Sequence, residues 1–239
     1  MTALLLEDIS FCHPGGGCLF RHLKLAIGAE RVGFIGPNGS GKTTLFHIIM
    51  GLLKPDSGRI LLDGREVSDA RAWRQLRRQV GFLFQDADDQ LFSPTVLEDV
   101  TFGSLNMGDD GPTAKAKAMA TLESLDLAGF AGRITHQLSG GEKKLVALAT
   151  ILVMAPEILL LDEPTNNLDI ATRERLVAIL AHLDLPMVII SHDFDFLAKS
   201  TDIIYSLDHG HLHRSESIHL HSHPHAHIYG DHPHDHGGY

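Results

Sequence analysis

The residues between positions 36 and 44 have the types and spacing that hold phosphate groups in proteins. They follow an apolar run at 32–35 and precede a helical run at 45–53, so the sequence predicts a strand, a glycine loop and a helix. The glycines let backbone N–H groups turn toward a polyphosphate, and the helix N-terminus adds a partial positive charge. A glycine-rich surface turn, the alternative, would not require Lys42 and Thr43 behind a buried strand. The predicted ligand is a nucleoside triphosphate, bound by Gly36, Pro37, Asn38, Gly39, Ser40, Gly41, Lys42, Thr43 and Thr44.

Two adjacent acids, Asp162 and Glu163, end the apolar run at 158–161. Asp162 and the Thr43 hydroxyl are predicted to hold Mg²⁺, while Glu163 polarises the water that attacks the terminal phosphate. A buried strand that ends in acids is common by itself. Together with the glycine loop, the acid pair predicts a hydrolysis site.

A second element suited to an anion lies at residues 138–142. Ser139 and Glu142 have the spacing of a helix capping box, which by itself would only start a helix. Gly140 and Gly141 between them would also expose backbone amides at the helix N-terminus to a bound anion, which an ordinary cap does not need.

The apolar pattern predicts an α/β fold. Strands are expected first, at 4–11, 19–27 and 58–62, as an antiparallel layer. Helical patterns at 96–102 and 112–127 indicate an inserted helical subdomain. Strands at 158–161 and 187–190 then alternate with helices at 139–153 and 170–183, as in a parallel sheet with crossover helices.

Composition narrows the function. The 239 residues are 44% hydrophobic, enough for one domain or for one domain with a satellite subdomain. No apolar run reaches the ~20 residues that span a bilayer. The formal net charge of −10 argues against nucleic acid as a partner. The N-terminus lacks an export pattern, so a cytoplasmic location is expected.

Cys12 and Cys18 are expected to be reduced thiols, with a metal site that includes His13 as a weaker alternative.

The ordered set of motifs over residues 4–212 resembles the ATP-binding cassette (ABC) family. The matching elements are GPNGSGKTT at 36–44, Gln85, LSGGE at 138–142, LLLDEP at 159–164, NLD at 167–169 and SHD at 191–193. The resemblance implies a P-loop NTPase core of the ABC ATPase type at residues 1–214, with an antiparallel β layer and an inserted α-helical subdomain at about 94–154. ATP and Mg²⁺ are the implied cofactors.

In that family, two cassettes pack head to tail around two ATP molecules. The resemblance implies that Ser139 and Gly141 contact the γ-phosphate held by the opposite subunit, and that His192 contacts it from its own side. Gln85 would sense Mg²⁺ and the attacking water, and Asp169 would connect the two sites. Glu163, His192 and Gln85 are thus the catalytic candidates. Without the resemblance, His192 would be a capped loop histidine and Gln85 an ordinary strand end.

Two positions depart from the family pattern. His13 stands where an aromatic residue usually stacks on adenine, and an imidazole offers less stacking area. Glu142 replaces the commoner glutamine of the LSGGQ element, a change that preserves the capping geometry.

The segment 84–96 resembles energy-coupling-factor importers, especially their cobalt and nickel branch. In that family this region touches the coupling helix of the membrane subunit. Leu91 and Phe92 are therefore either docking residues or packing residues of the subdomain hinge, and the sequence favours neither.

Residues 215–239 form a histidine-rich tail that is expected to be disordered without ligand. Alternating imidazoles and nearby carboxylates suit Ni²⁺, Co²⁺, Zn²⁺ or Cu²⁺, although a solvating tail is the alternative. The predicted metal ligands are His219, His221, His223, His225, His227, His232, His234 and His236.

The sequence therefore predicts the ATP-hydrolysing subunit of a cobalt or nickel importer on the cytoplasmic face of the cell membrane. Its partners would be a second ABC ATPase subunit, in a homodimer or heterodimer, and integral membrane subunits. The alternatives are a soluble ABC ATPase of DNA repair or translation, and a metal-storage or metallochaperone protein with nucleotide-regulated release.

Overall fold

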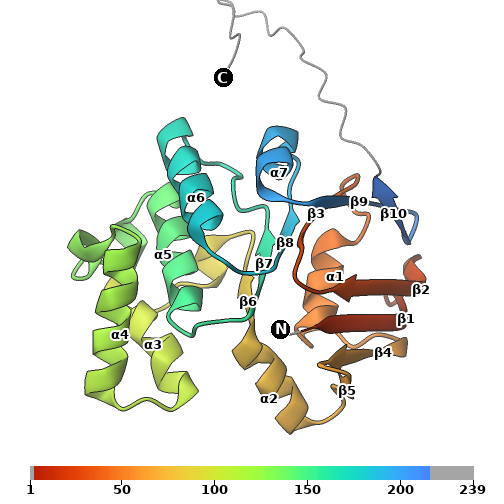
Figure 1. Cartoon of the computed structure of the whole chain (residues 1–239), viewed down its shortest axis with the longest axis horizontal. Helices are drawn as coiled ribbons and strands as arrows, with labels where there is room; N and C mark the ends of the chain where they lie inside the picture. Colours follow the sequence, from red (N-terminus) through yellow and green to blue (C-terminus); the bar gives the residue numbers. More distant parts are fainter. Residues whose placement is uncertain (1–2, 216–239) are drawn as a thin grey trace, which may run out of the picture.

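Two β-sheets and the helices that cover them make up residues 3–215, the part of the chain that the computed structural model describes (Figure 1). The first sheet is antiparallel, in the order β2-β1-β4-β5. Buried and exposed residues alternate along β1, which places one face of this sheet on the core. Its strands are β1 (Leu4–Cys12), β2 (Cys18–Ile27), β4 (Ser57–Leu62) and β5 (Arg65–Glu66).

The second sheet has the order β10-β9-β3-β8-β7-β6 and is parallel except for β10. Its inner strands β7 and β8 are buried at every residue, as expected for a sheet covered on both faces. The carboxyl ends of β3, β7 and β8 meet at one edge. The strands are β3 (Arg31–Ile35), β6 (Val80–Leu83), β7 (Ile158–Asp162), β8 (Met187–Ile190), β9 (Ile203–Asp208) and β10 (His211–Ser215).

Seven α-helices in the described residues pack on these sheets, and they separate into two groups (Figure 1). Helix α1 lies in the hydrophobic core that both sheets share, whereas α3, α4, α5 and α6 form a second core with the other face of β7 and β8. The helices are α1 (Lys42–Ile49), α2 (Ala70–Gln79), α3 (Val96–Met107), α4 (Gly111–Ser124), α5 (Gly140–Leu152), α6 (Ile170–His182) and α7 (Phe194–Ser200).

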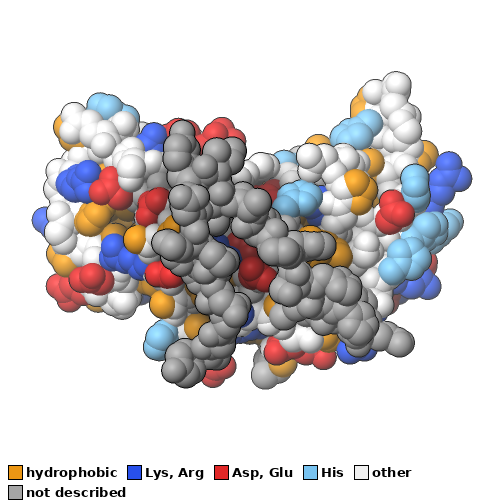
Figure 2. Space-filling model, turned by 90° about the horizontal axis from the view of Figure 1, so that it is seen from above, with side chains coloured by type: hydrophobic (Ala, Val, Ile, Leu, Met, Phe, Trp, Pro, Cys, Tyr) orange, Lys and Arg blue, Asp and Glu red, His pale blue; other side chains and the backbone are white. Residues whose placement is uncertain are grey.

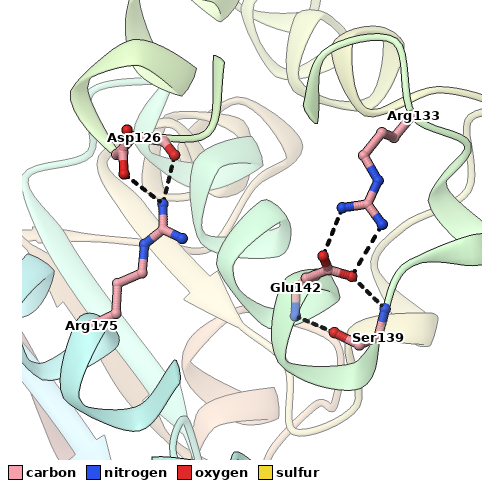
Figure 3. A network of polar contacts seen from close by, with 5 residues as sticks. All are labelled: Asp126, Arg133, Ser139, Glu142 and Arg175. Atoms are coloured by element: carbon pink, nitrogen blue, oxygen red, sulfur yellow. Dashed lines mark hydrogen bonds and ion pairs between the residues drawn. The ribbon is translucent and has the colours of Figure 1, made fainter. Parts of the chain in front are cut away.

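An arginine ties the far end of α4 to α6. The Arg175 guanidinium donates hydrogen bonds to the backbone oxygens of Leu125 (2.9 Å) and Asp126 (2.6 Å), which follow the last turn of α4. Figure 3 shows Arg175 reaching Asp126. Carbonyls at a helix end lack partners within the helix, so this cation satisfies groups that would otherwise need water. The end of α4 is thereby anchored to α6, which packs on β7 and β8.

The α/β architecture with an antiparallel layer confirms the fold predicted from the sequence. Helix α3 is longer than the predicted 96–102. It begins at a full capping box between Thr95 and Glu98 and ends at Gly108, whose φ of +102° is a left-handed conformation that glycine adopts without strain.

The two cysteines are joined in the structure, in contrast to the expectation of free thiols. Cys12 and Cys18 are direct partners in the antiparallel β1–β2 pair and form a disulfide. The expectation rested on cysteine number alone, which cannot show that a hairpin brings two thiols face to face. A metal site built on these sulfurs is therefore not formed.

On the face shown in Figure 2, acidic and basic side chains lie interspersed. Within residues 3–215, no helix has both the length and the apolar character needed to cross a bilayer.

Candidate nucleotide-hydrolysis site

The phosphate loop joins β3 to α1, and two of its glycines are required by its geometry. A Cβ on Gly36 (φ +151°) would lie 2.4 Å from the Leu207 carbonyl oxygen, and one on Gly41 (φ +99°) would lie 2.8 Å from the Phe20 ring. Both positions also have backbone angles that L-residues rarely adopt. The loop is thus held tightly between β9, β2 and the start of α1.

The Lys42 ammonium lies inside this loop and donates hydrogen bonds to the carbonyl oxygens of Gly36 (2.8 Å) and Pro37 (3.0 Å). Burial lowers its pKa, while Glu163 and Asp162 nearby oppose that change. A buried cation that donates to carbonyl oxygens of the loop is placed to bind an anion that enters it.

A cleft of about 680 Å³ lies against the loop, and we call it the nucleotide cleft. Its volume is in the range of pockets that bind small molecules. It brings together residues predicted from distant parts of the sequence, from β7 and β8 as well as the loop. The lining residues are His13, Leu19, Asn38, Gly39, Gly41, Lys42, Thr43, Thr44, Gln85, Asp162, Glu163, Asn166, Ile190 and His192.

Asp162, the last residue of β7, has the features of a metal ligand. Its side chain is 1% exposed, and neither carboxylate oxygen has a hydrogen-bond partner among the described residues. Burial raises its pKa; the Thr43 hydroxyl lies close enough to offset part of this rise without forming a full hydrogen bond. Bare carboxylate oxygens beside a hydroxyl fit Mg²⁺, which prefers hard oxygen ligands and keeps several waters. The ion would neutralise charge on the phosphates.

Glu163 and His192 form a pair at the ends of β7 and β8. The Glu163 carboxylate accepts a hydrogen bond from the His192 backbone N–H at 3.3 Å, and His192 Nε2 lies 3.4 Å from Oε1. Burial raises the pKa of Glu163, with His192 opposing the rise. Its φ of +44° is strained for a glutamate, and such strain is found at functional sites. A carboxylate whose pKa lies above its ordinary value suits a general base.

Gln85, which also lines the nucleotide cleft, is held in place by α5. The buried Lys144 ammonium donates to the backbone oxygens of Phe84 (3.2 Å) and Gln85 (2.6 Å). Farther along the same segment, the Gln90 amide donates to the Ala147 carbonyl (2.7 Å). The Gln85 segment and α5 therefore form one connected unit.

The predicted anion-binding residues at 138–142, which we call the signature end of α5, do not line the nucleotide cleft of their own chain. Gly140 does line an adjoining depression of about 660 Å³, which shares Thr43, Gln85, Asp162 and Asn166 with the cleft. The capping box is complete: Glu142 accepts from the Ser139 N–H (2.8 Å), and the Ser139 hydroxyl accepts from the Glu142 N–H (3.3 Å) (Figure 3). A Cβ on Gly141 would lie 2.9 Å from Thr172, whereas one on Gly140 would meet nothing within 4 Å. Gly140 therefore faces open space in the single chain.

Sequence reasoning missed three residues that line the cleft, Leu19, Ile190 and Asn166. Asn166 follows the acid pair in a turn, where its N–H donates to the Glu163 carbonyl (3.2 Å). His13 lines the cleft, with its ring edge-to-face on Phe11 at 5.2 Å. Asp169 caps α6 by accepting from Thr172.

The histidines predicted to bind a transition metal, at 219–236, lie outside the described residues. Within residues 3–215, no group of three or more His, Cys, Asp or Glu side chains is arranged to hold a metal ion.

Comparison with known proteins gives concordant matches. The family model described as "ABC transporter" matches residues 21–166. A protein of Nitratidesulfovibrio vulgaris, provisionally described as an ABC transporter ATP-binding protein, is 52% identical over 87% of this chain and 77% of its own length. The cobalt import ATP-binding protein CbiO of Rhodobacter capsulatus is 42% identical over 84% of this chain and 74% of its own length.

Solved structures agree. The structure of cbiO1 from Clostridium perfringens, part of the ABC transporter complex cbiONQ, has a TM-score of 0.78 at 33% identity, over 87% of this chain and 86% of that one. A dimeric ATP-binding cassette in a post-hydrolysis state with ADP and Pi has a TM-score of 0.80 at 28% identity, over 91% of this chain and all of that one. The chain therefore belongs to the ABC transporter family as an ATP-binding cassette, and ATP hydrolysis is the chemistry that this family and the site share.

Proposed function

We propose that this chain is the ATP-hydrolysing subunit of a membrane importer for cobalt or nickel ions. In this proposal it works as a cassette dimer on the cytoplasmic face of the membrane, beneath integral membrane subunits. The ATPase assignment follows from the family; the transported ion and the partners are the proposal. The cobalt import protein of Rhodobacter capsulatus and the cbiO1 structure support it.

One observation carries the dimer: the signature end of α5 is built to bind an anion, yet none of its residues lines the nucleotide cleft of its own chain, and only Gly140 reaches the adjoining depression. A Cβ placed on Gly140 would have no neighbour within 4 Å, and Ser139 is exposed. A glycine with open space at a helix N-terminus suits close approach of a ligand brought by another molecule. The dimeric cassette with ADP and Pi supports this arrangement.

An apolar depression of about 300 Å³ supports a membrane partner. It lies between the α3–α5 region and the core, where Met50, Leu52, Phe84 and Phe102 contribute to its walls. Phe92 also lines it and is 67% exposed, with its ring edge-to-face on Phe102 at 4.8 Å. Leu91, by contrast, packs against the helical core. Phe92 is therefore the better docking residue, because exposed aromatic side chains mark interaction sites.

The decisive experiment is to purify the tagged chain from detergent-solubilised membranes and to measure metal uptake by the recovered complex. Phe92→Asp should release the membrane subunits but leave ATP binding intact. Leu105→Asp is the control, since Leu105 is exposed on α3, the helix that follows Phe92, but does not line the depression. Recovery of membrane subunits with the Phe92 variant would contradict the docking proposal.

Co-purification also separates the alternatives. Recovery of nucleic acid in place of membrane subunits would favour a soluble ABC ATPase, and recovery of metal alone would favour a storage or metallochaperone protein. Uptake of neither cobalt nor nickel by an intact complex would reject the proposed ions.

The histidine-rich tail is proposed to bind Ni²⁺ or Co²⁺, as a buffer after import or as a regulator of the ATPase. Alternating imidazoles are its only support. Removing residues 216–239 should abolish most Ni²⁺ binding in isothermal titration and leave a folded ATPase. Equal nickel stoichiometry in the full-length and shortened chains would refute a metal-binding tail.

A further inference from the structure

The signature end of α5 carries a full negative charge where the proposed function requires it to meet a triphosphate. Glu142 lies in the first turn of α5, three residues from the N-cap Ser139. A helix N-terminus attracts anions through a partial charge of about +0.5, and one carboxylate in the first turn is enough to cancel it. An unpaired Glu142 would therefore oppose the binding of ATP presented by a partner.

Arg133 removes this conflict. Its guanidinium donates to both carboxylate oxygens, from Nη1 to Oε1 at 2.6 Å and from Nη2 to Oε2 at 3.3 Å (Figure 3). A guanidinium stays charged at every accessible pH, and two parallel hydrogen bonds fix its orientation. This pairing, followed by the bond from the Ser139 N–H, lowers the pKa of Glu142 to about 2. The pair is thus fully ionised at physiological pH and has no net charge.

The position of Arg133 is itself fixed. Its guanidinium lies over the Phe130 ring, 4.6 Å from the ring centroid. Its backbone oxygen accepts from the Val96 N–H (3.1 Å), and its neighbour Ile134 forms a bridge with Thr95. The start of α3 therefore holds the arginine beside α5 before any ligand binds.

We propose that Arg133 is a positioning residue for ATP-driven closure, which holds the Glu142 cap in place and neutralises its charge beside the incoming triphosphate. This inference rests on the proposed cassette dimer. It deepens that proposal, because it assigns the control of charge at the signature end to a residue outside the motif.

A double-mutant cycle tests it. In a Glu163→Gln background that binds ATP without turnover, the ATP concentration for half-maximal dimerisation is measured by light scattering. Arg133→Ala should raise this concentration roughly fivefold to tenfold, since it leaves Glu142 charged and unpaired. Glu142→Gln should change it by less than about twofold, and the double variant should match Glu142→Gln. The Arg133→Ala defect should shrink at high salt.

If Arg133 only held the loop in place, the variants would show a different pattern of effects. Either single substitution would then break the same link and have the same effect, and Glu142→Gln would not rescue Arg133→Ala. That result would overturn the inference. Arg175→Ala is the matched control: it loosens the helical subdomain at Asp126 without changing the signature end, so it should lower the melting temperature and leave the half-maximal ATP concentration unchanged.

The same experiment keeps the two proposals apart. If the Glu163→Gln chain stays monomeric at saturating ATP, the cassette dimer fails and this inference fails with it. If it dimerises and Arg133→Ala has no effect, only the role of Arg133 is rejected.

Discussion

The nucleotide cleft and the signature end of α5 are both predicted to contact phosphate, but their polar groups are arranged in opposite ways. In the cleft, both oxygens of Asp162 and one of Glu163 are buried without a hydrogen-bond partner among the described residues. At the signature end, Ser139, Glu142 and Arg133 satisfy one another. Burial raises the carboxylate pKa values in the cleft, whereas pairing lowers that of Glu142.

This difference separates reacting groups from a binding surface. Unpartnered buried carboxylates cost stability, and they persist where a ligand or a reaction needs them. A helix end whose side chains are already satisfied offers only its backbone amides, and it needs no rearrangement when an anion arrives. The cleft is therefore expected to control the rate of hydrolysis. The signature end is expected to control how readily ATP closes the proposed dimer.

The largest expected effect is a loss of turnover, caused by a substitution in the nucleotide cleft. Glu163→Gln removes the general base while keeping the size of the side chain, so kcat should fall by about 10² to 10⁴. ATP binding should remain, since the loop and Lys42 are untouched. A steady-state phosphate-release assay beside a nucleotide-binding titration checks both. Near-normal turnover would show that Glu163 is not the general base. The proposed difference between the cleft and the signature end would then be wrong.

An intermediate effect is expected at the signature end from Gly140→Ala. The added methyl group meets no atom in the single chain, and alanine is favoured over glycine in a helix by about 0.5–1 kcal/mol. The variant should therefore melt no lower than the native chain. Its ATPase rate should nevertheless fall roughly 10- to 100-fold, because in the proposed cassette dimer the methyl group would displace the triphosphate held by the other subunit.

Gly141→Ala is the matched control for this prediction. Its methyl group would lie 2.9 Å from Thr172, so it should cost about 1–3 kcal/mol of folding stability by overpacking. Thermal melts thus distinguish a loss of activity caused by poor packing within the chain, expected for Gly141→Ala, from one caused by contact with a partner, expected for Gly140→Ala. A native ATPase rate for Gly140→Ala would show that no ligand approaches that end.

The smallest expected effect is a pH-dependent change in stability. The pKa of Glu163 is raised in the folded chain, so the native state holds the proton more tightly than the unfolded state, and stability falls as pH rises from about 4.5 through the raised value. Glu163→Gln removes this loss and should raise the melting temperature at pH 7.5 by about 2–4 °C for each kcal/mol recovered. The gain should vanish below about pH 4. If the melting temperature of Glu163→Gln stayed higher than that of the native chain below pH 4, the buried charge of Glu163 could not be the cause of the gain.

The sequence predicted the parts of the fold whose signals are local. The glycine loop, the apolar strands that end in Asp162 and before Ser191, and the capping box at Ser139 each carry their own signature within a few residues. Helix α2 was not predicted, because its apolar face is too small to give a clear helical pattern. Leu76 is its one buried residue, among several arginines. The disulfide was missed because it depends on strand register.

The residues of the site were predictable where they belong to motifs, and the contacts between elements were not. Nothing in the sequence pairs Arg133 with Glu142, or places Asn166 against the cleft, since these contacts arise from how loops return to the sheet edge. The pKa changes were likewise beyond prediction, because they depend on burial and on partners that only the folded chain defines.

The bond between Lys144 and the Gln85 carbonyl limits how the cassette can move. One buried ammonium attaches the glutamine at the rim of the cleft to α5, whose N-terminal turn the proposed cassette dimer would present to a neighbouring subunit. If a membrane subunit docks at Phe92, seven residues beyond Gln85, a displacement there would be passed to Gln85 and to α5 together. In the proposed importer, this one lysine would therefore couple ATP binding to contact with the membrane subunits.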